Sequence, residues 1–296
     1  MNLVFKNKGT TAGFAAWLSA FKEIQSSLLI ECDLKEQCFV SKGFTADHTV
    51  VKYSKISFDN AGLEILNIRD NDNVAYSVEE WNEKYNVRIK IGIFMILPKF
   101  ISVIDIFKDT DFNFTVDFDV YKSHTGDEFH AQAIKIKSRT NSMKVKDCNI
   151  SEFEQVSDDL FFTRINVIDK PMSFEIPMSV LKNLTSISGI FVTDAKKDII
   201  KFYTKIDEGT NKWGLYAYDD TNESYDYLLG FLTNGEGVEN SVPIYRSNFF
   251  TAINLKGGDD SVIITLPADS KQKVRVESVD GTSYTARMIP VEANEF

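Results

Sequence analysis

The sequence contains few of the residues and motifs on which enzyme active sites depend. It has 3 histidines and 3 cysteines among 296 residues. No stretch matches GxGxxG or GxxxxGKS/T, the glycine-rich loops that bind nucleotide phosphates. No GxSxG segment offers a hydrolase nucleophile. We therefore expect a protein that is not an enzyme, with no catalytic residues and no cofactor.

The three histidines, His48, His124 and His130, do not form a metal motif. The segment HTGDEFH leaves 5 residues between the last two, a spacing that fits no established zinc site. Acidic residues gather in turns, as at Asp219 and Asp220, where aspartate favours the turn itself. The sequence predicts no metal site, and an enzyme with an unusual acidic site remains one of three hypotheses.

The cysteines and the apolar runs indicate where in the cell the protein is expected. Cys32, Cys38 and Cys148 include no CxxC pair, which is typical of reduced thiols in a cytoplasmic protein. The longest apolar run, 91–97, is far shorter than the roughly 20 residues of a membrane helix, and the N-terminus has no signal-peptide core. We expect no membrane contact and a cytoplasmic location, in the host cell if the protein is viral.

Basic residues are outnumbered. The chain has 33 Lys and Arg against 43 Asp and Glu, a net charge of −10. Proteins that grip DNA over a large surface are usually basic. The composition therefore argues against a tight, static DNA binder, but it allows a protein that gathers a few Lys and Arg residues on one face.

One pattern repeats along the chain: a strand, a short amphipathic helix, a turn and further strands. A proline stands near the start of three of the helices, and Pro243 suits a first helical turn, where its missing N–H costs nothing. In the last fifty residues Asp280 and Gly281 form a hairpin turn between two alternating strands. The predicted helices cover residues 11–25, 98–109, 178–189 and 243–254.

Four such modules predict an α+β fold of two similar domains, each with two strand-helix-meander modules. Internal repetition constrains architecture more than any single motif does. The predicted domains are 1–150, with an insertion near 60–86, and 170–296, joined by a connector at 151–169.

This order resembles the DNA sliding clamps of the proliferating cell nuclear antigen type, including phage clamps, and Met288-Ile289-Pro290 resembles the apolar-x-Pro tail of that family. The resemblance implies sheets outside and helices lining a ring. It implies a phage-type processivity factor, a homotrimer that encircles duplex DNA without reading its sequence. The implied partners are a DNA polymerase, other replication proteins and a clamp loader ATPase.

The resemblance also implies two sites. The DNA-facing residues of the inner ring are Lys22, Lys99, Lys108, Lys182 and Arg246. The pocket for partner peptides is formed by Phe44, His48, Val51, Leu160, Phe161, Phe162, Ile289 and Pro290.

Family rings close by strand pairing, and the sequence places the pairing edges near 109–120 of one subunit and 189–194 of the next. A β-rich phage virion protein is the main alternative. It accounts for the strands and the acidity, but not for four strand-helix modules.

Overall fold

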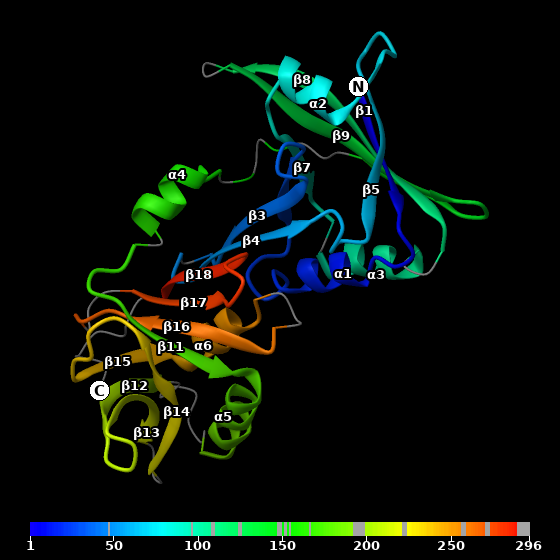
Figure 1. Cartoon of the computed structure of the whole chain (residues 1–296). Coiled ribbons are helices and arrows are strands. Elements are labelled where there is room, and N and C mark those ends of the chain that lie inside the picture. Colours follow the sequence, from blue (N-terminus) through cyan, green and yellow to red (C-terminus); the bar gives the residue numbers. More distant parts are fainter. Residues whose placement is uncertain are drawn as a thin grey trace. The chain divides into compact units, whose positions relative to one another are not determined.

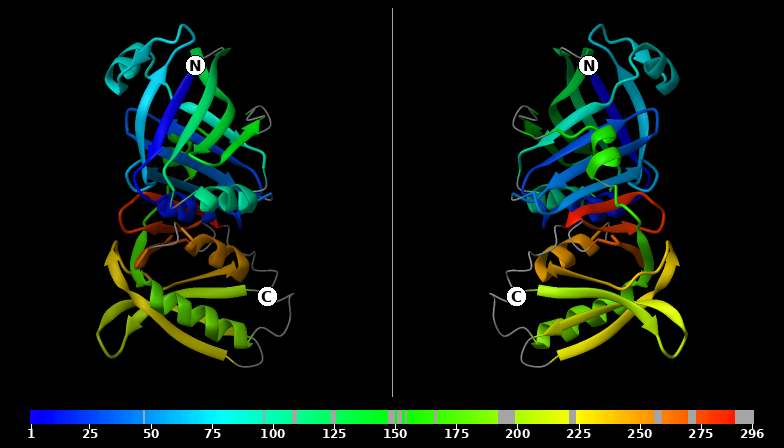
Figure 2. Two further views of the ribbon diagram at one scale, coloured as in Figure 1. Left: turned by 90° about the vertical axis from the view of Figure 1, so that its right-hand side faces the viewer. Right: turned by 90° about the vertical axis from the view of Figure 1, so that its left-hand side faces the viewer.

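The computed structural model consists of two compact units (Figures 1 and 2). The first comprises Met1–Gly43 and Tyr53–Gln155, and the second comprises Phe44–Lys52 and Val156–Phe296. The division after Gln155 falls inside the predicted connector. The residues that the structure describes are 1–46, 48–95, 97–107, 110–123, 126–146, 150, 153, 155–165, 167–191, 199–220, 224–255, 259–269 and 273–288.

In the first unit, β1 and β2 each pair with a neighbouring strand on both sides. β1 lies between β5 and β8, and β2 lies between β3 and β7. β8 continues into β9, and β9 pairs with β10. The strands are β1 (Asn2–Asn7), β2 (Leu28–Asp33), β3 (Cys38–Phe44), β4 (Val51–Ser57), β5 (Leu63–Arg69), β6 (Ala75–Tyr76), β7 (Ile89–Ile93), β8 (Phe112–Ser123), β9 (Gly126–Ser138) and β10 (Ser142–Lys146).

The second unit repeats this scheme. β11 lies between β14 and β16, and β12 lies between β13 and β15. β16 pairs with β17, which pairs with β18. The strands are β11 (Met172–Pro177), β12 (Ile199–Asp207), β13 (Lys212–Asp220), β14 (Ser224–Asn234), β15 (Asn240–Tyr245), β16 (Ser261–Leu266), β17 (Val274–Ser278) and β18 (Ser283–Met288).

In each of the four modules, one helix directly follows one strand. α1 follows β1, α3 follows β7, α5 follows β11 and α6 follows β15. These four modules confirm the predicted α+β class with two similar halves. The helices are α1 (Ala12–Ser19), α3 (Leu97–Phe107), α5 (Met178–Phe191) and α6 (Arg246–Ile253).

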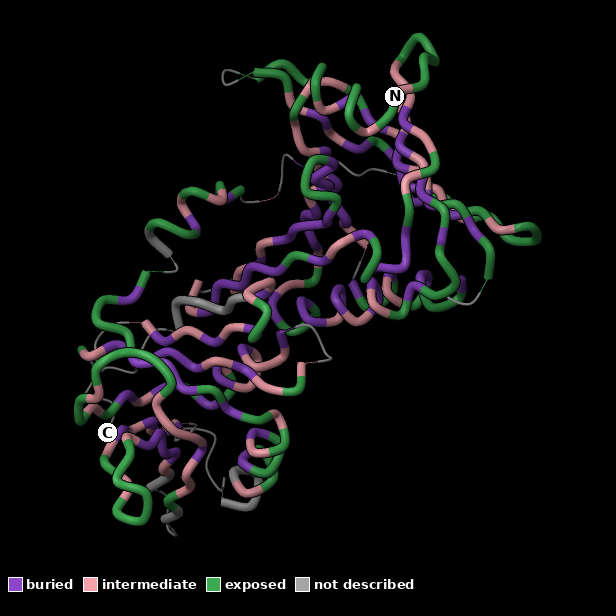
Figure 3. Tube along the Cα trace, viewed as in Figure 1, coloured by how far each residue is buried: buried purple, intermediate pink, exposed green. Residues whose placement is uncertain are grey.

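Each unit has a core that contains several aromatic side chains, and the buried residues of both units are purple in Figure 3. In the first unit Phe5 contacts Phe39 and Phe58, with ring centroids 5.5 and 5.0 Å apart. In the second unit Phe202 of β12 packs against Phe249 of α6 at 4.6 Å. Side chains alternate across a strand, so the neighbours of Phe202 point to the opposite face of the sheet.

Part of the first unit has no counterpart among the described elements of the second. β5 belongs to the shared scheme, whereas β6 and the helix α2 (Val78–Lys84) do not. Ser77 caps α2 in a capping box with Glu80. Trp81 is completely buried against Phe118 and Phe129, with centroids 5.7 and 5.6 Å apart. This tryptophan fixes the extra helix to the first core.

Two helix ends differ clearly from the sequence prediction. α1 ends at Ser19 instead of residue 25, because tighter turns follow it, such as the Phe21 amide bonding to the Leu18 carbonyl at 3.0 Å. Pro243 lies in β15, opposite Lys201 of β12, and α6 starts only at Arg246. The predicted turn at Asp280-Gly281 is confirmed, with Gly281 at a φ of 67° between β17 and β18.

Within the described residues, no helix is both long enough and apolar enough to cross a membrane.

Candidate nucleic-acid and partner interfaces

The helices of the first unit carry two of the lysines predicted to face DNA. α1 and α3 lie side by side (Figure 1). Lys99 is exposed near the start of α3, and Lys22 is exposed in the turn after α1, 3.8 Å from Glu23. Lys108 lies outside the described residues. Asp105 is also exposed on α3, so the described charges of this region, Lys22 and Lys99 against Glu23 and Asp105, balance.

Of the lysines predicted to face DNA, the one in the second unit is Lys182, which is exposed on α5. Arg246 differs from the prediction, because its residue is only 5% exposed at the first position of α6. The sequence placed Arg246 opposite Phe249 on a longer helix. Since α6 begins later, the position became a buried helix start. In this conformation its guanidinium is not presented to a phosphate.

Hydroxyl side chains occupy much of the remaining helix surface. Four of them donate hydrogen bonds to the carbonyl four residues earlier, at 2.8 to 3.2 Å. Such bonds satisfy the hydroxyl within its own helix. The described helix faces are therefore polar but carry few charges. These residues are Ser19, Ser102, Thr185 and Ser186.

The predicted partner-pocket residues at 44–51 lie in the segment Phe44–Lys52 of the second unit. The rings of Phe44 and His48 are 5.7 Å apart, whereas Val51 is completely buried. The segment closes on itself, because the Thr45 amide donates to the Val50 carbonyl at 3.1 Å. His48 has a φ of 56°, which is uncommon for a residue with a Cβ.

The other predicted pocket residues lie on a short helical segment, α4 (Asp158–Leu160) continued by the π-helix η1 (Phe161–Ile165). Phe161 is completely buried and its ring contacts Phe162 at 5.1 Å. Phe162 is 38% exposed. Single π-helical turns are frequent at functional sites. Ile289 and Pro290 lie outside the described residues.

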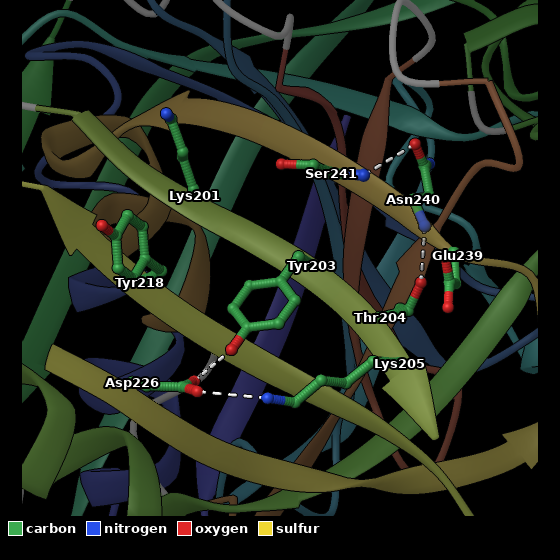
Figure 4. Close-up of a pocket in the computed structure, with 9 residues that line it drawn as sticks. All are labelled: Lys201, Tyr203, Thr204, Lys205, Tyr218, Asp226, Glu239, Asn240 and Ser241. Carbon is green, nitrogen blue, oxygen red and sulfur yellow. Dashed lines mark hydrogen bonds and ion pairs between the residues drawn. The ribbon is translucent and has the colours of Figure 1, made fainter. Parts of the chain in front are cut away.

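The structure also contains a hollow that the sequence analysis missed, on the face of β12, β13 and β15 opposite the core (Figure 4). Tyr203 stacks on Tyr216 at 5.3 Å, and its hydroxyl bonds to Asp226. Lys205 pairs with Asp226 at 3.2 Å and lies 4.5 Å above the Tyr216 ring. Burial and Asp207 raise the pKa of Tyr216 to about 12. The tyrosines at alternate positions of these strands were the available sequence signal.

The matching face of the first unit has a different chemistry. Arg88 bonds to Glu31 and Asp33, each at 2.7 Å, beside β2. Lys90 and His130 both contact Glu128, at 2.9 and 2.8 Å. The hydrogen bonds from Lys90 and His130 hold the pKa of Glu128 below its usual range. Ion pairs thus cover the strands of this unit where tyrosines cover those of the second.

Metal ligation has no support in the described part of the chain, which contains no group of three or more His, Cys, Asp or Glu residues placed to hold an ion. His124, one of the two histidines of HTGDEFH, lies outside it.

The sequence matches no family model and no curated protein. Solved structures show a similarity over nearly the whole chain. A PCNA from A. fulgidus bound to the C-terminal region of FEN-1 has a TM-score of 0.62 and 12% identity, over 98% of this chain and 99% of that one. The PCNA2-PCNA3 complex of Sulfolobus tokodaii has a TM-score of 0.60, 12% identity and the same coverage.

A Helicobacter pylori beta clamp bound to a DNA ligase peptide has a TM-score of 0.61 and 11% identity over 97% of this chain. The chain spans 66% of the length of that bacterial clamp. These structural similarities establish the architecture, and the repeated modules within the chain agree with it. The chain therefore has the fold of the DNA sliding clamps.

Proposed function

We propose that the protein is a DNA sliding clamp, a processivity factor that encircles duplex DNA and tethers a DNA polymerase. The observation that carries the proposal is the duplicated strand-helix scheme, which matches clamp structures over 97% of the chain or more. The mechanism is topological. A closed ring cannot leave long DNA, so the polymerase stays at a high effective concentration near the primer end.

The ring is a homotrimer in this proposal. The chain matches 99% of the two PCNA chains but 66% of the bacterial clamp, so its two units correspond to a whole PCNA-type subunit. Three such chains supply six similar units around one hole. A closed point-group ring is the usual outcome when a head-to-tail contact returns to its start.

The strand pairings point to different ring-closing edges from those predicted. Residues 112–117 of β8 pair with β9, and most of them also pair with β1, so this stretch is not an edge. Among the described pairings, β10 has a partner on one side only, and so does the half of β14 that pairs with β13. We place ring closure between β10 of one subunit and β14 of the next.

The contact with DNA is weak and not sequence-specific. Lys22, Lys99 and Lys182 are exposed and are repeated three times around the ring. Each neutralised phosphate contributes about 0.9 to the slope of log affinity against log salt. A clamp must slide, so a small number of phosphate contacts suits the function, and the net charge of −10 is compatible with it.

The proposed partners include replication proteins that dock through short peptides. Similar clamps have been solved with a DNA ligase peptide and with the C-terminal region of FEN-1. In this chain we assign docking to Phe44, His48 and the exposed Phe162, with Ile289 and Pro290 from the tail. A clamp loader ATPase would open the ring, and a phage source remains part of the proposal.

The likeness to clamps over the whole chain favours this function above a virion component. The test is retention on DNA. The protein is incubated with a linear plasmid, because a closed ring can thread onto DNA at a free end without a loader. The ends are then joined by ligase, and complexes are isolated by gel filtration before and after the circle is cut again. Protein that stays on the circle and leaves the linear form is the expected result. Equal recovery from both forms contradicts encirclement.

A charge variant links retention to the helices. Lys99→Glu with Lys182→Glu should reduce retention on the circle at least tenfold, because six lysines around the ring become acidic. The matched control replaces the exposed lysines Lys35 and Lys212, which lie away from the helices, with Glu. An equal loss in both pairs would refute the assignment of the helix faces.

A further inference from the structure

Lys52 is a lysine with no exposed surface in the second unit. Lysine is almost never fully buried unless it is paired. The Nζ of Lys52 donates a hydrogen bond to the carbonyl oxygen of Asn254. Asn254 is the C-cap of α6. The last carbonyls of a helix have no partner within it and form the negative end of its dipole. Lys52 therefore attaches its own segment to the end of α6.

A second contact joins the same two elements. The side-chain amide of Asn248, on α6, donates to the hydroxyl of Thr49 at 3.4 Å. Inside the segment, the Val50 amide bonds to the Thr45 hydroxyl at 3.0 Å. These contacts hold the segment Phe44–Lys52 on α6, with the buried amino group of Lys52 at its end.

Two opposing effects act on the charge of Lys52. Loss of water around the side chain disfavours the charged form and is the larger effect, while Asp259 favours it, and together they lower the pKa of Lys52 to about 7. The segment itself contains His48, and α6 has Arg246 at its opposite end, with Asp260 following Asp259. Asp47 and Lys256 lie outside the described residues.

We infer that Lys52 is a releasable anchor, which holds the segment Phe44–Lys52 on the end of α6 and lets it go on acidification. In water a lysine keeps a pKa near 10.4. Between about pH 7 and that value, release takes up a proton, so lowering the pH favours release by up to tenfold per unit. Below about pH 7 both states are charged and the balance stays constant.

The anchor has a consequence for binding that rests on the proposed function. The segment contains Phe44 and His48, which we assign to partner docking. While Lys52 holds the segment on α6, the two rings stay in one position for a partner to bind. Once the segment is released, they no longer do. The anchor itself depends on neither DNA nor a ring, so it can be tested separately.

The test is hydrogen exchange measured by mass spectrometry on peptides covering 44–52, at pH 5, 6, 7, 8 and 9 and corrected for intrinsic exchange. Protection should be constant up to about pH 7 and should then rise by up to about 100-fold between pH 7 and 9. Lys52→Met should remove the rise, since methionine fills similar space without a charge. Lys55→Met is the matched control, because Lys55 is exposed on the same strand, and it should keep the rise.

Equal protection at every pH in the unchanged protein would overturn the inference, as would a Lys52→Met protein with the same rise. Asp259→Asn gives an independent test if methionine at position 52 prevents folding. Removing this carboxylate should lower the pH below which protection becomes constant. An unchanged profile would exclude Lys52 as the group responsible. Failure of plasmid retention leaves each of these results intact.

Discussion

The two units share one strand scheme but stabilise its outer faces differently. On the first unit, Arg88 joins Glu31 and Asp33, and Lys90 joins Glu128. On the second unit, the same face is built from stacked tyrosines and from the ion pair between Lys205 and Asp226. The core positions repeat and the outer positions do not. The fold therefore depends on alternating buried residues, and the outer face is free to change with function.

The largest effect should come from the positions that the units share. Phe5 and Phe202 are both completely buried, one in each core. Replacing either with alanine should cost about 3–5 kcal/mol of unfolding free energy, because contacts are lost and a cavity remains. Calorimetry should show each variant lowering the transition of its own unit. A loss below about 1 kcal/mol in either would contradict equal core roles.

The next largest effect should come from Lys52, the buried lysine of the second unit. The pKa of Lys52 is lowered in the folded state, so the unfolded state binds more protons between about pH 7 and 10. The free energy of unfolding should rise in that window by up to about 1.4 kcal/mol per pH unit. Urea titrations of Lys52→Met should show no such rise. The same slope in both proteins would contradict the burial of a titrating lysine.

The ion pairs on the outer faces should contribute less to the free energy of unfolding. Arg88 is partly exposed and makes two charge-assisted bonds, so Arg88→Ala should cost about 1–2 kcal/mol. Lys205 and its partner are 43% and 47% exposed, and Lys205→Ala should cost at most about 1 kcal/mol. Urea unfolding in low and high salt measures both. A larger loss for Lys205 would reverse the ranking of the two faces.

The extra helix of the first unit gives the smallest and most local effect. Ser77→Ala removes the cap of α2 and should cost about 1 kcal/mol. Hydrogen exchange should increase in peptides covering 78–84. Peptides from the second unit serve as the internal control and should not change. Increased exchange there would show that the cap acts beyond its own helix.

Much of the fold could be predicted from the sequence, because it is repeated four times. The helix at 178–189 and the hairpin turn at Asp280-Gly281 both appear as predicted, since local patterns decide them. Pro243 could not be placed in the same way. Val242 and Ile244 are completely buried in β15, and pairing with β12 outweighed the preference of proline for a helix start.

The candidate sites were less predictable. Helical periodicity predicted that Lys99 and Lys182 are exposed, and they are. Arg246 is buried instead, because α6 begins later than the pattern indicated. The hollow at Tyr203 depends on side chains from four strands, which no local pattern brings together. The burial of Lys52 depends on a contact with a residue about two hundred positions away. Long-range contacts of this kind are settled by the tertiary structure alone.

In the proposed closed ring, the two units together make one subunit. Light scattering on a size-exclusion column, at several protein concentrations, tests this arrangement. A species of three times the chain mass of 33.6 kDa is expected. A mass of one chain at every concentration would contradict it.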